Sequence, residues 1–242
     1  MTIKGVFFDL GGTLFSYRNV AITNVPLLVE SARKMGADCA EHEIKKAYGA
    51  ASKQVTEHYA DKSFYLHRDL FGDIYTRFLQ LLELEYDEET HHWYRKRQQT
   101  EIVNCLEIKH DCIDTLATLK QRGLYLSIAS NIDDSMLDPL VEREGLANYF
   151  DHWVSSETAQ ACKPHEDFFH YCLAKSGLSP HQVLFVGDSP EHDIVGAERA
   201  GMKTALIYDG DNPPPMQTGR ASAEADHEVH NLSDLLHLLE AS

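Results

Sequence analysis

The chain has 242 residues, of which 43% are hydrophobic and 25% charged, a composition typical of a globular protein large enough for a full core and a smaller companion domain. Its formal net charge of -16 disfavours contact with nucleic acids or anionic membranes, since phosphate groups are held by clustered Lys and Arg. No apolar stretch approaches the roughly 20 residues that span a bilayer. The five cysteines form no CxxC pair, which suits a reducing compartment. We therefore expect a cytoplasmic protein.

The first predicted element is a strand at residues 6–8, which ends in Asp9 and is followed by Gly11 and Gly12. At the carboxyl end of a strand in an open parallel sheet, side chains project into the crevice where ligands bind. Glycines there let the backbone approach a charged ligand closely. Asp9 is therefore the leading candidate for a chemical role, although Asp and Gly also end strands for backbone reasons alone.

From about residue 17 to about residue 105 the pattern is helical, without a convincing strand. One apolar stripe recurs every four residues, at Leu66, Leu70, Ile74, Phe78 and Leu82, as on one face of a long helix. Further helices are predicted at about 27–35 and 41–59. We expect a small helical bundle here.

An alternating pattern of strands and helices follows this block and predicts a parallel doubly wound α/β sheet. The stretch at 209–223, which contains three consecutive prolines, is expected to be a mobile loop with a gating role. The predicted strands are at about 124–129, 153–154, 183–186 and 204–208, and the predicted helices at about 113–119, 135–144, 165–176, 192–200 and 232–239.

Four strand ends or loops carry reactive side chains in a distinctive order. These are Asp9 with Thr13, Ser130 with Asn131, Lys163 before Pro164, and Asp188 with Asp193. As a set, this order resembles the haloacid dehalogenase (HAD) superfamily of aspartate-nucleophile hydrolases over nearly the whole chain. The resemblance implies a Rossmann-like α/β core of residues 1–16 and 106–242, with a helical cap domain of residues 17–105 that closes over the strand ends.

The resemblance also implies roles in the hydrolysis of a small phosphorylated molecule. Asp9 would attack phosphorus and form an aspartyl phosphate, while Lys163 would neutralise negative charge and Ser130 would hold a phosphate oxygen. Asn131 and the loop of Gly11, Gly12 and Thr13 would bind further phosphate oxygens.

A divalent metal and a loop hydroxyl complete the implied site. Mg²⁺ prefers oxygen ligands, which Asp9, Asp188 and the backbone carbonyl of Gly11 would supply, with Asp193 as a further direct or water-mediated ligand. Thr13 would form a hydrogen bond within the loop and orient Asp9.

Gly11 departs from the resemblance, because most phosphatases of the superfamily carry there a second aspartate that protonates the leaving group. A replacement group could come from the cap, where His67, Tyr59, Asp61 and Arg18 are unranked candidates. Alternatively, the substrate has a good leaving group, or the protein binds its ligand without turnover. A gain in turnover by the Gly11→Asp variant on esters with poor leaving groups would show what the missing carboxylate costs.

Other activities stay open beside a phosphatase. Phosphonate cleavage would need a cap lysine, and Lys45, Lys46, Lys53 and Lys62 are available. Dehalogenation needs no metal, because its electrophile is neutral carbon. Since Asp188 and Asp193 favour a metal, we rank dehalogenation below phosphate hydrolysis. A non-catalytic binding module is the alternative of a different class. The sequence is compatible with a monomer or a homodimer.

Overall fold

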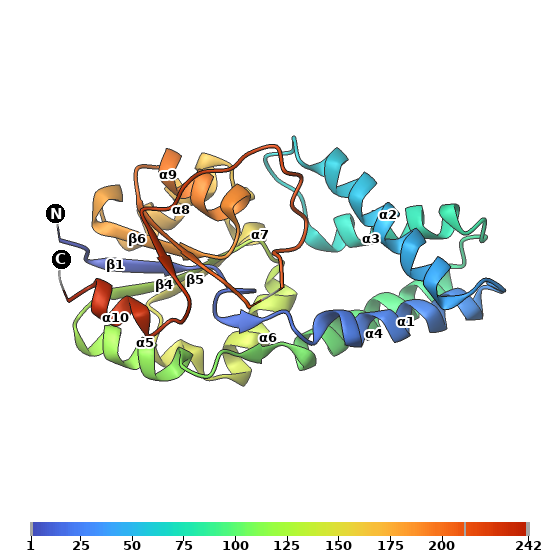
Figure 1. Cartoon of the computed structure of the whole chain (residues 1–242), viewed down its shortest axis with the longest axis horizontal. Coiled ribbons are helices and arrows are strands. Elements are labelled where there is room, and N and C mark those ends of the chain that lie inside the picture. The colour runs from blue at the N-terminus through green and yellow to red at the C-terminus, as the bar shows by residue number, and fades with distance from the viewer. Residues whose placement is uncertain (1, 211, 241–242) are drawn as a thin grey trace.

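The computed structural model describes residues 2–210 and 212–240. Its main sheet has six parallel strands in the order β5-β4-β1-β6-β7-β8 (Figure 1). This confirms the predicted α/β class, whereas β8 at the sheet edge was not predicted. The strand bounds are β1 Gly5–Phe8, β4 Tyr125–Ser130, β5 His152–Ser155, β6 Val183–Gly187, β7 Lys203–Ile207 and β8 His227–Val229.

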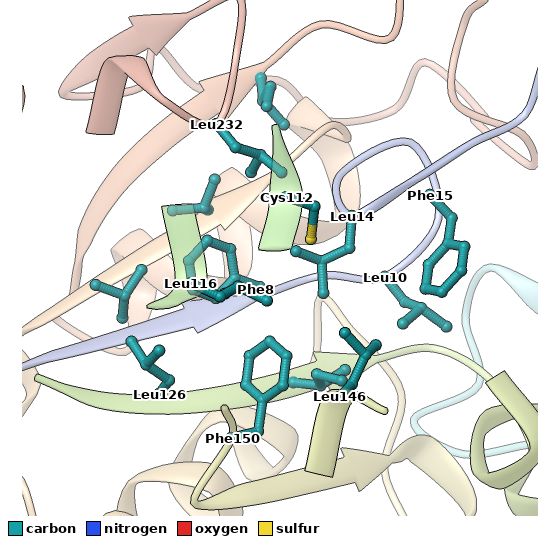
Figure 2. Packing of buried hydrophobic residues seen from close by; sticks show 14 of the residues in the cluster. Phe8, Leu10, Leu14, Phe15, Cys112, Leu116, Leu126, Leu146, Phe150 and Leu232 are labelled. Atoms are coloured by element: carbon teal, nitrogen blue, oxygen red, sulfur yellow. The ribbon is translucent and has the colours of Figure 1, made fainter. Parts of the chain in front are cut away.

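Helices cover both faces of this sheet. Alternate side chains of β1 point to opposite faces, and both sets are buried. Val6 and Phe8 join one buried cluster, whereas Phe7 joins another. Figure 2 shows the first cluster, with Phe8 close to Leu116. The first cluster includes α5 (Cys112–Gln121), α6 (Asp134–Arg143) and α10 (Asp234–Leu238), and the second includes α8 (Glu166–Ser176) and α9 (Val195–Arg199).

Four helices separate β1 from β4 in the chain and extend to one side of the sheet (Figure 1). They have a hydrophobic core of their own. The predicted stripe lies on α3, where Leu70, Ile74 and Phe78 are buried. We name these helices the helical insertion; they are α1 Val20–Lys34, α2 Glu41–Tyr59, α3 His67–Leu81 and α4 Glu88–Cys105.

Two short strands that the sequence did not reveal join the insertion to the sheet domain. Residues Phe15–Ser16 form β2 and residues Glu107–Ile108 form β3, and the two pair antiparallel. Strands of two residues are too short to show a period-2 pattern, which explains why they were missed. The chain thus enters and leaves the insertion side by side.

A π-helical turn, Pro190–Ile194, precedes α9 where the sequence predicts one α-helix. The amides of Asp193 and Ile194 both donate to the Ser189 carbonyl, at 2.9 and 3.2 Å. Such turns are frequent at functional sites. Elsewhere, α7 (Ser156–Ala159) and two 3₁₀ turns were not predicted. Among the described residues, no helix is both long and apolar enough to cross a membrane.

Candidate active site

The register of the three central strands brings the predicted site residues to one sheet edge. Phe8 lies beside Ile128 of β4 and Val186 of β6, so Ser130 and Asp188 each extend two residues beyond those partners. Asp9 follows Phe8 directly, and its amide donates to the Val186 carbonyl at 2.9 Å. The carboxyl ends of these three strands therefore lie together at one edge of the sheet.

Asp9 is held through one of its two carboxylate oxygens. Its Oδ1 accepts hydrogen bonds from Ser130 Oγ at 2.9 Å and from Lys163 Nζ at 2.6 Å. No described residue donates to its Oδ2, although Asp9 lines a pocket. The carboxylate is therefore fixed in orientation with one oxygen free to react.

Lys163 links the nucleophile candidate to Asp193. Its Nζ lies 2.7 Å from Asp193 Oδ1 and also donates to the Ala129 carbonyl at 3.0 Å. Burial lowers the pKa of Lys163, but Asp193 and Asp9 outweigh it and raise the pKa above its ordinary value. The ammonium form is thus favoured, and its contacts with Asp9, Asp193 and Ala129 hold it in place.

Asp188 is the unpaired member of this group. Its carboxylate is 7% exposed, and its Oδ2 is buried without a hydrogen-bond partner among the described residues. Burial raises the pKa of Asp188 well above its ordinary range, and Asp9 and Asp193 raise it further. Burial also raises the pKa of Asp9, against the effect of Lys163. An ionised Asp188 is costly here unless a cation joins it.

Asp9, Asp188 and Asp193 bring carboxylate oxygens within 4.8 Å of one another. With these three ionised and Lys163 charged, the cluster keeps two negative charges, which a divalent cation would balance. The unpaired Oδ2 of Asp188 supplies a vacant oxygen ligand of the kind that Mg²⁺ prefers. Asp193 is less available, because its Oδ2 accepts from the Ser189 amide at 3.0 Å and its Oδ1 pairs with Lys163.

The remaining predicted residues lie nearby, but several are occupied by structural contacts. The Asn131 side chain accepts from the Lys163 amide at 2.7 Å and donates to its carbonyl at 2.9 Å, so it positions Lys163. The Gly12 amide donates to the Phe15 carbonyl at 2.6 Å. The expectation that Thr13 forms a hydrogen bond within the loop is wrong, because its buried hydroxyl has no partner among the described residues.

Tyr17 is the residue that sequence reasoning missed. It lines the pocket together with Asp9, Asp188 and Lys163. Burial raises the pKa of Tyr17 well above its ordinary value, and Asp188 and Asp9 add to this effect. The hydroxyl is therefore protonated and able to donate a hydrogen bond. No sequence signal marks Tyr17, because it follows a strand of only two residues and belongs to no motif or periodic pattern.

The loop after β7 forms another wall of the pocket, through Pro214, Pro215 and Met216. It is attached to both parts of the protein. Its Gln217 accepts from Ser189 Oγ at 3.0 Å on the sheet side. Arg220 of the same loop contacts Asp61 of the insertion at 3.0 Å. The loop therefore bridges sheet and insertion beside the site, as Figure 1 shows.

The insertion itself contributes Tyr65 to the pocket. The four candidates for replacing the missing aspartate at position 11 do not line it. Tyr59 donates to Asp73 at 2.6 Å, Asp61 pairs with Arg220, and Arg18 pairs with Glu107. His67 is buried beside Ser156. Lys45, Lys46, Lys53 and Lys62 likewise do not line the pocket. Within the part of the chain that the structure describes, Lys163 is the one lysine of the pocket wall.

A wider hollow lies between the β2–β3 ribbon and the loop that follows β7. Its walls include Arg18, His110 and Tyr208. It contains none of the three clustered carboxylates. The pocket at Asp9 is therefore the candidate active site.

His67 provides a prediction for stability. Burial lowers its pKa from 6.5 to about 3, with His192 and Lys163 contributing. A neutral His67 lies only 3.9 Å from Asp133, so this contact is not an ion pair. Between pH 6.5 and about 3 the unfolded chain binds a proton that the folded chain excludes. The free energy of unfolding should therefore fall with decreasing pH by about 1.4 kcal/mol per unit from this residue.

Urea unfolding across this pH range measures the effect. The His67→Phe variant should lose this part of the pH dependence, whereas His42→Phe, at an exposed position of α2, should keep it. Equal slopes for the original chain and His67→Phe would contradict a buried neutral imidazole.

Comparisons with known proteins agree with this geometry. A family model described as haloacid dehalogenase-like hydrolase matches residues 3–201. A ribulose-1,5-bisphosphate 5-phosphatase of Halopiger xanaduensis is 25% identical over 246 residues, covering 97% of this chain and 98% of that protein. The (S)-2-haloacid dehalogenase 4A of Burkholderia cepacia is 25% identical over 244 residues, covering 98% and 95%.

A solved structure shows the same fold. The magnesium-bound crystal structure of the HAD-hydrolase YfnB from Bacillus subtilis superposes with a TM-score of 0.75 at 20% sequence identity, over 99% of both chains. That structure is described as revealing interdomain movement. The similarity therefore extends over both the sheet and the inserted helices.

Proposed function

Because the chain belongs to the haloacid dehalogenase-like hydrolase family, we propose that it is a Mg²⁺-dependent phosphatase of small phosphorylated molecules with Asp9 as nucleophile. The observation that carries this proposal is that two carboxylates lie together: Asp9, which is fixed in orientation, and Asp188, whose Oδ2 has no hydrogen-bond partner among the described residues. A cation-binding carboxylate beside the nucleophile suits an anionic substrate, whereas a neutral carbon electrophile has no need of it. The phosphatase relative of H. xanaduensis supports the same reading.

In the proposed reaction, the free Oδ2 of Asp9 attacks phosphorus as the bond to the leaving oxygen breaks. The leaving group departs with the bonding electrons and takes up a proton from solvent. Water then cleaves the aspartyl phosphate, returns a proton to solvent and regenerates Asp9. Ser130 and Lys163 hold Oδ1 so that Oδ2 faces the substrate, and Lys163 offsets the negative charge. Bound Mg²⁺, held by Asp9, Asp188 and the Gly11 carbonyl, would reduce the repulsion between carboxylate and phosphate.

We also propose that residues 17–105 act as a cap that selects the substrate and excludes water. Contacts across the boundary support this role. The amides of His67 and Arg68 both donate to the Asp133 carboxylate at 2.8 Å, and the Cys162 amide donates to the Ser63 carbonyl at 2.7 Å. These bonds set Tyr65 against the pocket. A cytoplasmic location and a monomeric or homodimeric state stay predictions.

The test is release of phosphate from p-nitrophenyl phosphate and acetyl phosphate, with Mg²⁺ and with EDTA. Chloride release from 2-chloropropionate in EDTA is measured in parallel, because one relative is a haloacid dehalogenase. We expect Mg²⁺-dependent phosphate release and no chloride release. Chloride release without phosphate release would favour the dehalogenase alternative. Mg²⁺ binding without either product would favour a non-catalytic binding protein.

A further inference from the structure

Tyr17 occupies the space in which a side chain at position 11 would lie. A Cβ atom built on Gly11 would overlap the Tyr17 hydroxyl and lie 2.7 and 2.8 Å from Cζ and Cε1 of its ring. A Cβ on Gly12 would lie 2.9 Å from Cε2 of the same ring. The tyrosine thus covers both glycines, and its hydroxyl stands beside the residue that separates this chain from most phosphatases of its family.

Contacts of the neighbouring backbone hold Tyr17 in this place. Its amide donates to Asp209 Oδ2 at 2.8 Å, and Asp209 is only 8% exposed. Lys109 Nζ lies 3.6 Å from the Asp209 carboxylate and donates to the Gly12 carbonyl at 2.6 Å. Lys109 thereby connects the loop of Gly11 and Gly12 to Asp209, which binds the Tyr17 amide. Residues from separate parts of the chain therefore hold the backbone of Tyr17 beside the loop of Gly11 and Gly12.

The hydroxyl of Tyr17 makes no hydrogen bond with any other described residue, and Tyr17 shares the pocket with Asp9 and Asp188. A protonated donor without a partner, next to the nucleophile, is suited to a substrate oxygen. We propose that Tyr17 is a catalytic residue that donates a hydrogen bond to the leaving-group oxygen as its bond to phosphorus breaks. This inference rests on the proposed phosphatase function.

Gly11→Asp alone should therefore give no gain in turnover. The new side chain would collide with Tyr17 and displace the hydroxyl, so the single substitution should lower turnover of esters with poor leaving groups. Removing the tyrosine ring first makes room for the carboxylate. The Gly11→Asp/Tyr17→Ala double variant should consequently be more active than Gly11→Asp alone.

The first experiment compares the original chain with Tyr17→Phe on phenyl phosphate and p-nitrophenyl phosphate at saturating Mg²⁺. Loss of one such donor should lower kcat about 10²-fold for phenyl phosphate, whose leaving group needs stabilisation most. For p-nitrophenyl phosphate the loss should be less than about fivefold. Tyr86→Phe, at an exposed position far along the insertion, is the matched control and should change neither rate.

The second experiment measures thermal stability and turnover of Gly11→Asp, Tyr17→Ala and their double variant. Gly11→Asp should lower Tm less in the Tyr17→Ala background than in the original chain. Equal losses by Tyr17→Phe on both esters, or additive changes in Tm, would overturn the role of Tyr17 while leaving the phosphatase intact. An original chain that releases no phosphate from either ester would overturn both.

Discussion

The Asp9→Asn variant is expected to release phosphate from p-nitrophenyl phosphate at least about 10³-fold more slowly than the original chain. An amide oxygen is a poor nucleophile, so the covalent step is lost. The fold should survive, because the Asn carbonyl oxygen can still accept from Ser130 and Lys163, as Asp9 Oδ1 does now. Initial rates, with circular dichroism as the check on folding, measure this effect.

A covalent intermediate provides the second readout for Asp9. Acid-quenched reactions with acetyl phosphate should yield a phosphorylated peptide containing residue 9 from the original chain and none from Asp9→Asn. Asp38→Asn, at an exposed position after α1, is the control and should behave as the original chain. Substantial turnover by folded Asp9→Asn would refute the proposed nucleophile.

The Asp188→Asn variant is expected to have opposite effects on activity and on stability. Loss of a carboxylate ligand should lower Mg²⁺-dependent turnover at least about 10²-fold, since metal charge stabilisation amounts to several kcal/mol. The metal-free protein should become more stable at neutral pH by about 1–3 kcal/mol, because a buried charge without a partner disappears. Asp188 Oδ2 is buried without a hydrogen-bond partner among the described residues.

The pH dependence follows from the raised pKa of Asp188. Below the pKa of the unfolded state the carboxyl is protonated in both states and costs nothing. Between that pKa and the raised folded-state pKa, the unfolded chain releases a proton that the fold retains, so the metal-free fold loses stability as pH rises. The gain from Asp188→Asn should therefore vanish in acid and be complete above the folded-state pKa.

Mg²⁺ titrations complete this test. Excess Mg²⁺ should raise the Tm of the original chain, by an amount corresponding to about 2.7 kcal/mol at 100 times Kd, and should not raise that of Asp188→Asn. Asp38→Asn again serves as the control. A lower stability of metal-free Asp188→Asn at neutral pH, or an unchanged response to Mg²⁺, would contradict the assignment of Asp188 as a metal ligand.

The sequence by itself determined the sheet and the convergence of its reactive residues. Asp9, Ser130 and Asp188 each end a buried apolar run, and parallel strands place their carboxyl ends at one edge whatever the details of packing. Local patterns also revealed the helical insertion, because the apolar stripe of α3 repeats along one helix face. These properties are encoded in neighbouring residues.

Only the tertiary structure decided what surrounds Asp9. Tyr17 reaches the space beside Gly11 because β2 pairs with β3 and because Asp209 holds its amide. The wall formed by Pro214 and Met216 likewise depends on contacts of its loop with both the sheet and the insertion. Such placements arise from pairings between residues far apart in the chain, which leave no periodic or local signal. The sequence therefore points to Asp9 as the proposed nucleophile, whereas long-range packing places Tyr17 beside Gly11.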